Sequence, residues 1–315
     1  MNAFLKIIRF PNLLIIAMTQ VIIRYFIVQS MLRINGFQLQ FPLDLFILLI
    51  ISTLLIAAAG YMINDYFDEK VDSINKPDQV IIGKKIGRNT IYNLYYIFNF
   101  AAILMGFYIT FKIDMTGMGV VFILIPGLLW FYSTTYKNQL IIGNLIVALI
   151  TSLVPLITGV FELIAINLAY QEVLVEYGIN FNAILYWVMG YSFFAFIITF
   201  CREIIKDAED FEGDVLTGRY SMPAAIGIKG TKIFLLFLLA MIITSLVWVY
   251  RQHINDAFTF WYLTFFIALP LAITGYYIAR ARSKKDFHIA SILSKIVMIT
   301  GIMYGIAVKY IIKNL

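Results

Sequence analysis

Cysteine and histidine are almost absent from this chain, which has one Cys and two His among its 315 residues. A single thiol, Cys201, excludes an intrachain disulfide, and no Cys-x-x-Cys or mixed Cys/His pattern typical of a zinc site is present. His253 and His288 each stand alone, without a second metal ligand nearby in the sequence, and we interpret both as solvated. A disulfide framework and a Cys/His metal site are therefore excluded.

Charge is also scarce, because only 13% of the residues are charged whereas 62% are hydrophobic. A soluble domain is nearer to a quarter charged and half apolar. Apolar runs of about 20 residues, the length that crosses a bilayer core, recur along the whole chain. We expect nine spans, at 11–33, 43–63, 90–111, 117–136, 140–162, 183–205, 231–250, 258–279 and 289–312. The prediction is an all-α integral membrane bundle of nine transmembrane helices in a single domain, 1–315.

The basic residues predict the orientation of this bundle. If the N-terminus is cytoplasmic, 17 of the 24 Lys and Arg fall on the cytoplasmic side, five fall on the other side, and two lie within spans. Lys and Arg in short loops accumulate on the cytoplasmic side, so we expect a cytoplasmic N-terminus. Lys6 and Arg9 precede a full-length span without a cleavage pattern, which argues against a cleaved signal peptide. The net charge of +6 thus indicates membrane anchoring, and no nucleic acid is expected as a partner.

Two acidic segments stand out at the ends of the second and sixth expected spans. In the first acidic segment (residues 64–72), Asn64, Asp68 and Asp72 are spaced i, i+4, i+8 and share one face of a helix. Asp65 adds a further carboxylate.

In the second acidic segment (residues 207–214), Asp207, Asp210 and Asp214 are spaced i, i+3, i+7, again on one face. Four expected spans separate the two segments, and an even number of crossings returns the chain to the same side. We therefore expect both segments to meet at the cytoplasmic face.

Such groups of carboxylates are unfavourable unless a cation compensates them. Neighbouring carboxylates repel, the helix C-terminus disfavours negative charge, and ionisable groups are costly at a membrane. Nearby Lys and Arg are one possible compensation, and a solvated helix end is another interpretation. Oxygen ligands without His or Cys suit Mg²⁺, which binds through one or two carboxylates plus substrate phosphates. Two such segments predict a two-part site for Mg²⁺, with two ions, around a diphosphate.

The first acidic segment fits the NDxxDxxxD pattern of the UbiA prenyltransferase superfamily, and residues 73–78 (SINKPD) continue the likeness. Residues 202–214 (REIIKDAEDFEGD) resemble the second motif of that family, in the form of the archaeal-type geranylgeranylglyceryl phosphate geranylgeranyltransferases. Residues 132–137 and 142–145 are similar to the family's segment between the fourth and fifth helices. The resemblance covers nearly the whole chain and implies a UbiA-like fold.

The chain departs from the family pattern directly after the first motif. Where the family commonly continues Arg-Pro-Ile-Pro-Ser-Gly, this sequence has Gln79-Val80-Ile81-Ile82-Gly83. The phosphate-facing role of the family's Arg is therefore not carried over. Lys84, Lys85 and Arg88 are nearby candidates to replace it.

The resemblance implies an enzyme in which a prenyl diphosphate ionises and a nucleophile of the acceptor captures the allylic cation. The residues expected to hold the metal for catalysis are Asn64, Asp68, Asp72, Asp210 and Asp214. Two further metal ligands are expected at Asp65 and Asp207. The residues expected to bind substrate are Lys137, Arg202, Lys206, Tyr132, Lys84 and Asn12. Arg24 falls in the outer half of the first span, away from the acidic segments, and is not assigned to the site.

The expected substrates are geranylgeranyl diphosphate and a lipophilic acceptor of the geranylgeranylglyceryl phosphate type. The protein is expected to contact membrane lipids and to need no obligate protein partner. An aromatic acceptor, as in quinone, chlorophyll or haem side-chain biosynthesis, remains the alternative. An ion-coupled transporter is a more remote one, because transporter sites lie near the bilayer midplane at broken helices. A soluble Asp-rich prenyl synthase is excluded by the hydrophobic composition.

Overall fold

The computed structural model describes residues 3–75, 80–216 and 218–313, without the side chains of residues 70–72, 74–75 and 312–313. Within these ranges the regular structure is helical, with one isolated bridge between Ile82 and Ile86 and no strand. The all-α prediction is confirmed.

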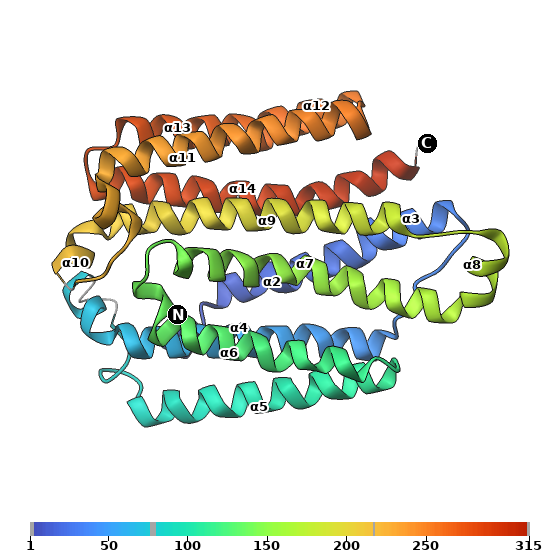
Figure 1. The fold of residues 1–315 in the computed structure, drawn as a ribbon, viewed down its shortest axis with the longest axis horizontal. Coiled ribbons are helices and arrows are strands. Elements are labelled where there is room, and N and C mark those ends of the chain that lie inside the picture. The colour runs from blue at the N-terminus through green and yellow to red at the C-terminus, as the bar shows by residue number, and fades with distance from the viewer. Residues whose placement is uncertain (1–2, 76–79, 217, 314–315) are drawn as a thin grey trace. The chain divides into compact units, whose positions relative to one another are not determined.

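The helices follow one another in the order that Figure 1 shows. The first half of the chain contains α1 (Ala3–Ile7), α2 (Phe10–Ile22), η1 (Ile23–Val28), α3 (Gln29–Ile34), α4 (Leu43–Asn75), α5 (Arg88–Lys112), η2 (Thr116–Val120), α6 (Val121–Thr134) and η3 (Tyr136–Asn138). The second half contains α7 (Ile142–Ala169), α8 (Gln171–Tyr177), α9 (Asn182–Glu209), α10 (Phe211–Leu216), α11 (Met222–Val249), η4 (Tyr250–Ile254), α12 (Ala257–Tyr262), η5 (Leu263–Ala268), α13 (Leu269–Arg280) and α14 (Lys284–Lys313).

Nine helical stretches in the described part of the chain are long and apolar enough to cross a membrane. Each of them overlaps one of the nine expected spans, and several are longer, such as Met222–Ile254, expected at 231–250. Several of them join consecutive elements, since the first span, Phe10–Ile34, comprises α2, η1 and α3. The second span lies in α4, which continues well beyond its apolar part to Asn75. The first acidic segment therefore lies on a regular helix, as its spacing predicts.

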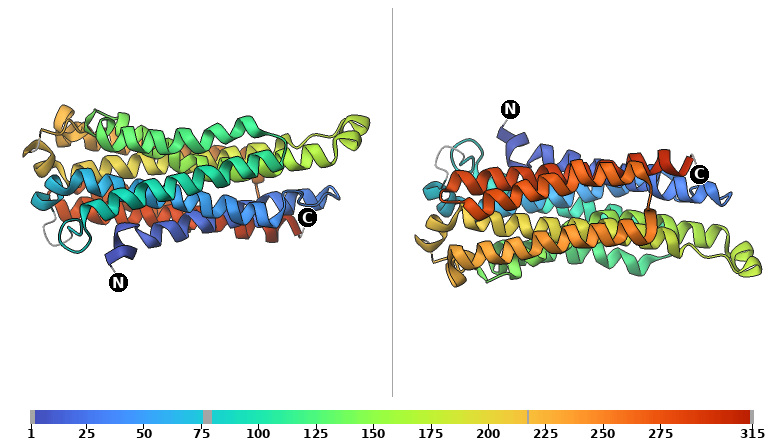
Figure 2. Two further views of the ribbon diagram at one scale, coloured as in Figure 1. Left: turned by 90° about the horizontal axis from the view of Figure 1, so that it is seen from below. Right: turned by 90° about the horizontal axis from the view of Figure 1, so that it is seen from above.

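The chain divides into two compact units, residues 1–136, 153–190 and 308–315 in the first and residues 137–152 and 191–307 in the second. In the first unit α4 packs along α5 and also contacts α2 and α6 (Figures 1 and 2). Small residues allow these helices to approach closely. An added Cβ at Gly106 of α5 would lie 2.1 Å from the ring of Phe122, which is overlap rather than contact.

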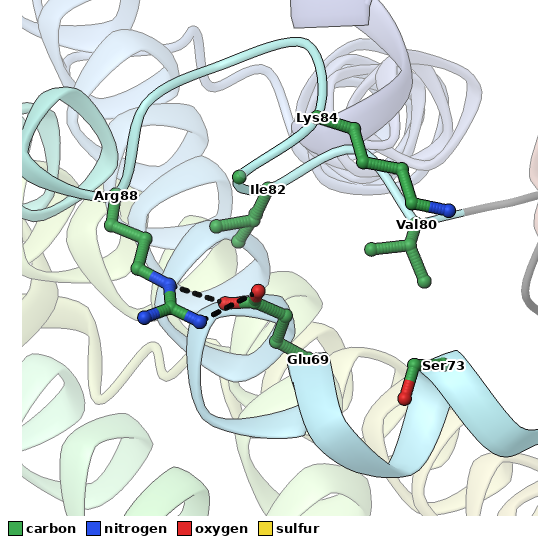
Figure 3. A pocket seen from close by; sticks show the side chains of 7 residues that line it. Glu69, Ser73, Val80, Ile82, Lys84 and Arg88 are labelled. Carbon is green, nitrogen blue, oxygen red and sulfur yellow. Dashed lines mark hydrogen bonds and ion pairs between the residues drawn. The ribbon is translucent and has the colours of Figure 1, made fainter.

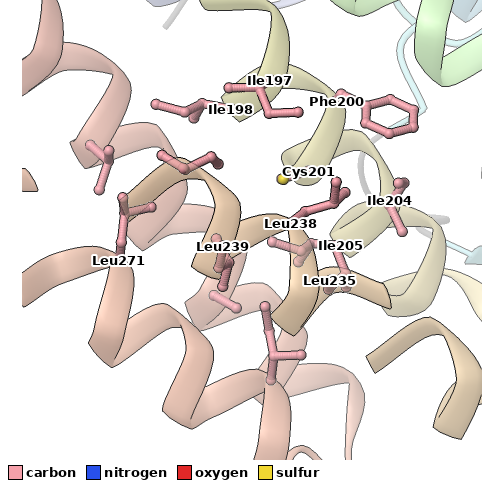
Figure 4. Close-up of a cluster of buried hydrophobic side chains, with 14 of the residues drawn as sticks. Ile197, Ile198, Phe200, Cys201, Ile204, Ile205, Leu235, Leu238, Leu239 and Leu271 are labelled. Carbon is pink, nitrogen blue, oxygen red and sulfur yellow. The ribbon is translucent and has the colours of Figure 1, made fainter. Parts of the chain in front are cut away.

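The second unit is built on α9, α11, α13 and α14. Figure 4 shows its apolar core, where Cys201 and Ile204 of α9 lie among Leu235 and Leu238 of α11 and Leu271 of α13. Cys201 is 1% exposed in this core. The single cysteine is thus a buried packing residue.

Candidate functional site

The first acidic segment lies on the last turns of α4, in the first unit. Asn64, Asp65 and Asp68 are all half-buried there. The Oδ1 atom of Asn64 is buried and accepts no hydrogen bond from the described residues. A buried acceptor without a donor is uncommon in proteins and fits a cation ligand. The side chain of Asp72 lies outside the described part of the structure.

Asp65 belongs to a small polar group that joins α4 to the start of α2. Arg9 Nη2 donates to Asp65 Oδ1 at 2.9 Å, and the Arg9 guanidinium lies 4.9 Å from the centre of the Tyr61 ring. Asn12 Nδ2 donates to the hydroxyl of Tyr61 at 3.5 Å. The structure therefore brings the two predicted site residues Asn12 and Asp65 together. It adds Arg9, which the sequence analysis treated only as an orientation signal.

The chain between α4 and α5 folds against the end of α4 and forms a pocket of about 400 Å³ (Figure 3). Its lining residues are Glu69, Ser73, Val80, Ile82, Gly83, Lys84 and Arg88. Arg88 makes a bidentate ion pair with Glu69, through Nε and Nη2 at 2.8 Å each. Gly83 has φ 75°, a conformation that favours glycine, and this turn places it against Glu69.

These contacts distinguish the candidate replacements for the family's Arg, whose position, Gln79, lies outside the described residues. Arg88 and Lys84 both line the pocket and are exposed, and Arg88 is paired with Glu69. Lys85 is exposed but is not part of the lining.

Aromatic side chains from α4, α5 and α6 cluster beside the first acidic segment. The rings of Phe67 and Trp130 are 5.6 Å apart, those of Tyr66 and Tyr92 are 5.9 Å apart, and Tyr95 lies 5.5 Å from Trp130. Tyr132, the predicted substrate contact, follows on α6 two residues after Trp130 and is half-buried.

The second acidic segment lies where α9 passes into α10, in the second unit. α9 ends at Glu209 and α10 begins at Phe211, yet the backbone bonding continues across the bend. Asp210 N donates to Lys206 O at 2.9 Å, and Asp214 N donates to Asp210 O at 3.0 Å.

Asp207 and Asp214 share one cation, the guanidinium of Arg219. Its nitrogens lie 3.9 Å from Asp207 Oδ1 and 3.7 Å from Asp214 Oδ1, and its Nε donates to the carbonyl of Lys137 at 3.0 Å. Asn144 of α7 donates from Nδ2 to Asp207 Oδ2 at 2.8 Å. Lys137 itself is buried, at 8% exposed.

Asp210 faces a different neighbour. Its Oδ1 lies 3.2 Å from Nζ of Lys284, at the start of α14, and His288 one turn later contacts Glu209 at 3.0 Å. Asp210 thus contacts Lys284, whereas Asp207 and Asp214 contact Arg219.

The predicted phosphate ligands Arg202 and Lys206 both contact Glu203. Arg202 Nη1 lies 3.2 Å and Lys206 Nζ lies 2.6 Å from Glu203 Oε1. Glu203 is therefore the counter-ion that orients this pair of cations on α9.

Sequence reasoning missed Asn144, Arg219 and Lys284 as members of this site. Asn144 lies within the stretch that resembles the family, and Arg219 follows Asp214 by five residues, but neither carries a spacing signal of its own. Their roles come from contacts across long sequence separations, 63 residues for Asn144 and Asp207.

No three His, Cys, Asp or Glu side chains converge on a single point among the described residues. The candidate ligands of both acidic segments are carboxylate and amide oxygens. This donor set fits Mg²⁺, which takes few protein ligands and completes its shell with phosphate and water.

The nine helical stretches of the described residues that are able to span a membrane define a multi-pass membrane protein. Two of them lead into acidic segments whose aspartates form ion pairs with Arg and Lys. The chain belongs to the UbiA prenyltransferase family, whose model matches residues 36–296. It is a membrane transferase of that family.

Curated relatives resemble the chain over most of its length. A digeranylgeranylglyceryl phosphate synthase of Methanosphaera stadtmanae is 30% identical over 303 residues, which cover 95% of this chain and 96% of the relative. The enzyme of the same name from Methanobrevibacter smithii is 30% identical over 254 residues, 81% of this chain and 80% of the relative.

Solved structures share the fold. A digeranylgeranylglyceryl phosphate synthase structure matches with a TM-score of 0.63 at 24% identity, covering 97% of this chain and 98% of that one. A UbiA homologue from Archaeoglobus fulgidus bound to DMAPP and Mg²⁺ matches with a TM-score of 0.59 at 15% identity, covering 98% of this chain and 100% of that one.

Proposed function

We propose that this prenyltransferase moves a geranylgeranyl group from its diphosphate to a geranylgeranylglyceryl phosphate-type lipid, with Mg²⁺ as cofactor. The observation that supports this acceptor is the similarity, over 95% of the chain, to a relative named digeranylgeranylglyceryl phosphate synthase. In this reaction the allylic C–O bond to the diphosphate breaks and a C–O bond to the acceptor's hydroxyl forms. The diphosphate leaves with the electron pair of the broken bond, and the proton of the hydroxyl passes to solvent.

The metal ligands in this proposal are oxygens of both acidic segments. On α4 the proposed ligands are Asn64, Asp65, Asp68 and Asp72. In the second acidic segment they are Asp207, Asp210 and Asp214. Support comes from the unsatisfied Oδ1 of Asn64 and from the full burial of Asp214, at 0% exposed. Mg²⁺, when bound, neutralises the diphosphate and makes it a better leaving group.

Basic side chains of the chain orient the diphosphate in this proposal. Lys84 is a candidate because it lines the pocket next to α4, and Lys137 because it lies next to the second acidic segment, where its carbonyl accepts from Arg219 Nε. Arg202 and Lys206 supply charge-assisted hydrogen bonds to phosphate oxygens once they exchange Glu203 for substrate.

The reactive end of the prenyl chain also requires shielding from water. The aromatic cluster of α4, α5 and α6 (Tyr66, Phe67, Tyr92, Tyr95 and Trp130) offers ring faces near the first acidic segment. Ring faces attract cations by about 0.5–2 kcal/mol, so this cluster and Tyr132 suit an allylic cation.

The orientation belongs to the same proposal. The N-terminus is cytoplasmic, and four described spans, α5, η2 with α6, α7 and α9, lie between the ends of the two acidic segments. An even number of crossings returns the second segment to the side of the first, so both serve the cytoplasmic face.

The test uses the purified chain in liposomes with radiolabelled geranylgeranyl diphosphate. With geranylgeranylglyceryl phosphate added as the acceptor, we expect label in its digeranylgeranyl product, loss of transfer in EDTA, and recovery with Mg²⁺. Asp68→Ala and Asp210→Ala should lose at least a hundredfold in rate, whereas Asp44→Ala, at the opposite end of α4, should retain activity.

Two outcomes would contradict the proposal in different ways. Label in an aromatic acceptor alone would overturn the acceptor. Full activity of both Asp68→Ala and Asp210→Ala would overturn the metal site.

A further inference from the structure

Arg219 lies between the two most deeply placed carboxylates of the second acidic segment. Asp214 is 0% exposed and Asp207 is 9% exposed, so both are shielded from water. Two ionised carboxylates in such surroundings repel strongly, because the local dielectric is low. The guanidinium of Arg219, 3.7 Å from one and 3.9 Å from the other, offsets that repulsion.

The position of Arg219 is set by the backbone around it. Its Nε bonds to the carbonyl of Lys137 at 3.0 Å, which is shorter than either of its ion-pair contacts. Its own backbone N–H bonds to the carbonyl of Asp214 at 2.9 Å. Arg219 is therefore attached both to η3 and to the end of α10, and its charge is held beside the carboxylates.

The ion pairs differ from a tight salt bridge. Charge-assisted N–H···O bonds are about 2.7–2.9 Å long, whereas both contacts of Arg219 with the aspartates are close to 4 Å. By contrast, Asn144 holds Asp207 Oδ2 at 2.8 Å. A guanidinium at this distance supplies charge while a neutral amide orients the carboxylate.

We propose that Arg219 is a positioning residue that acts as a built-in counter-cation. It keeps Asp207 and Asp214 close together while no metal is bound, and it competes with the metal for their charge. This inference rests on the proposed function, because it takes Asp207 and Asp214 to be ligands of a divalent cation.

Competition has a measurable consequence in the absence of substrate. Without the guanidinium, the metal-free protein loses the charge that offsets the carboxylate repulsion, and it becomes less stable. A divalent cation then restores the missing charge. Because a ligand stabilises a protein more as its dissociation constant falls, the variant should gain more stability from the metal than the wild type does.

The experiment compares Arg219→Gln and Arg219→Lys with the wild type in detergent, and uses Arg280→Gln as the matched control. Arg280, at the end of α13, lies 4.9 Å from the Tyr276 ring and outside the acidic segment. In EDTA we expect the melting temperature of Arg219→Gln to fall by about 4–10 °C. Saturating Mg²⁺ should recover most of that loss, Arg219→Lys should fall between, and Arg280→Gln should show no metal-dependent difference.

A second readout is Mn²⁺ binding followed by electron paramagnetic resonance. The dissociation constant of Mn²⁺ should decrease at least threefold in Arg219→Gln, with an unchanged KM for the prenyl diphosphate. An equal loss of melting temperature with and without metal, at unchanged Mn²⁺ affinity, would show a merely structural role and overturn the inference. A raised KM with unchanged Mn²⁺ affinity would make Arg219 a phosphate ligand and also overturn it.

These measurements separate the inference from the proposed function. If the wild type binds Mn²⁺ and Arg219→Gln shows the expected changes in melting temperature and Mn²⁺ affinity, but the wild type transfers no geranylgeranyl group, only the proposed function is overturned. A protein that transfers the group but lacks the shifts would overturn only the role of Arg219.

Discussion

Arg24 and Glu162 form an ion pair in the interior of the first unit, with Arg24 Nε 3.1 Å from Glu162 Oε2 and side chains only 3% and 1% exposed. Glu162 Oε1 also accepts the backbone N–H groups of Gln40 and Phe41, at 2.7 and 2.9 Å. Arg24 in turn donates to the carbonyl of Phe41 and lies 4.3 Å from the ring of Phe46. The pair thus connects α7 and η1 with the loop before α4. These contacts explain why the charged Arg24 lies within a membrane span.

Removal of one partner of this pair should destabilise the protein. Arg24→Met leaves a buried carboxylate without its counter-ion, which costs about 3–5 kcal/mol. Glu162→Leu should cost at least as much, because it also deprives two backbone N–H groups of their acceptor. Thermal unfolding in detergent measures both effects.

The double variant Arg24→Met with Glu162→Gln is the informative control. It removes the charge yet keeps an oxygen for the two N–H groups, so it should be more stable than Arg24→Met alone. A double variant less stable than Arg24→Met would contradict this account of the pair.

Asn144 should matter for the second acidic segment through its bond to Asp207. Asn144→Ala removes a 2.8 Å charged hydrogen bond from a buried carboxylate, a loss of about 1.5–3 kcal/mol in stability. Asn144→Asp places a like charge beside Asp207 and should lower stability. This loss should be larger in EDTA than in Mg²⁺.

The comparison variant for Asn144 is Asn138→Ala, whose side chain is exposed. We expect it to unfold at the wild-type temperature. Identical melting curves for Asn144→Ala and Asn138→Ala would rule out the role of the Asn144 bond.

The ion pair between Glu69 and Arg88 should position the turn that carries Lys84. Glu69→Arg and Arg88→Glu each break the bidentate contact and place like charges together, so both should raise the KM for the prenyl diphosphate. The charge-swapped double variant should recover much of the loss. Steady-state kinetics of the four proteins would measure the coupling, and additive losses would show that the pair has no positioning role.

Helix packing in the first unit predicts a contrast between two glycines. Gly106→Ala forces a Cβ into the ring of Phe122 and should destabilise by about 1–3 kcal/mol. Gly190→Ala, in α9, meets no atom within 4 Å and should be neutral or slightly stabilising, since Ala favours a helix. Melting temperatures of the two variants test the contrast, which equal losses would contradict.

The membrane fold was predictable from the sequence because it follows from local composition. A run of about 20 apolar residues is stable in a bilayer only as a helix, whose backbone groups bond within the segment. All nine expected spans are confirmed in the described residues, and α4 continues through Asn64 and Asp68 as their spacing predicts. The two acidic motifs likewise predicted the UbiA family.

The partners of the charged residues could not be predicted in this way. Arg24 looked like an isolated charge, and Arg219 looked like one more basic residue of a short loop. Their acceptors lie far away along the chain, as with Arg219 and the carbonyl of Lys137, 82 residues apart. Spacing within one helix carries no information about such contacts.

The sequence by itself thus determined which segments cross the membrane and which residue types gather at the helix ends, because hydropathy and helical periodicity act over neighbouring residues. Only the tertiary structure decided that Asp207 and Asp214 share Arg219 while Asp210 faces Lys284. The physical reason is that the pairing of buried charges depends on how separate helices and loops pack, and their partners lie far away along the chain.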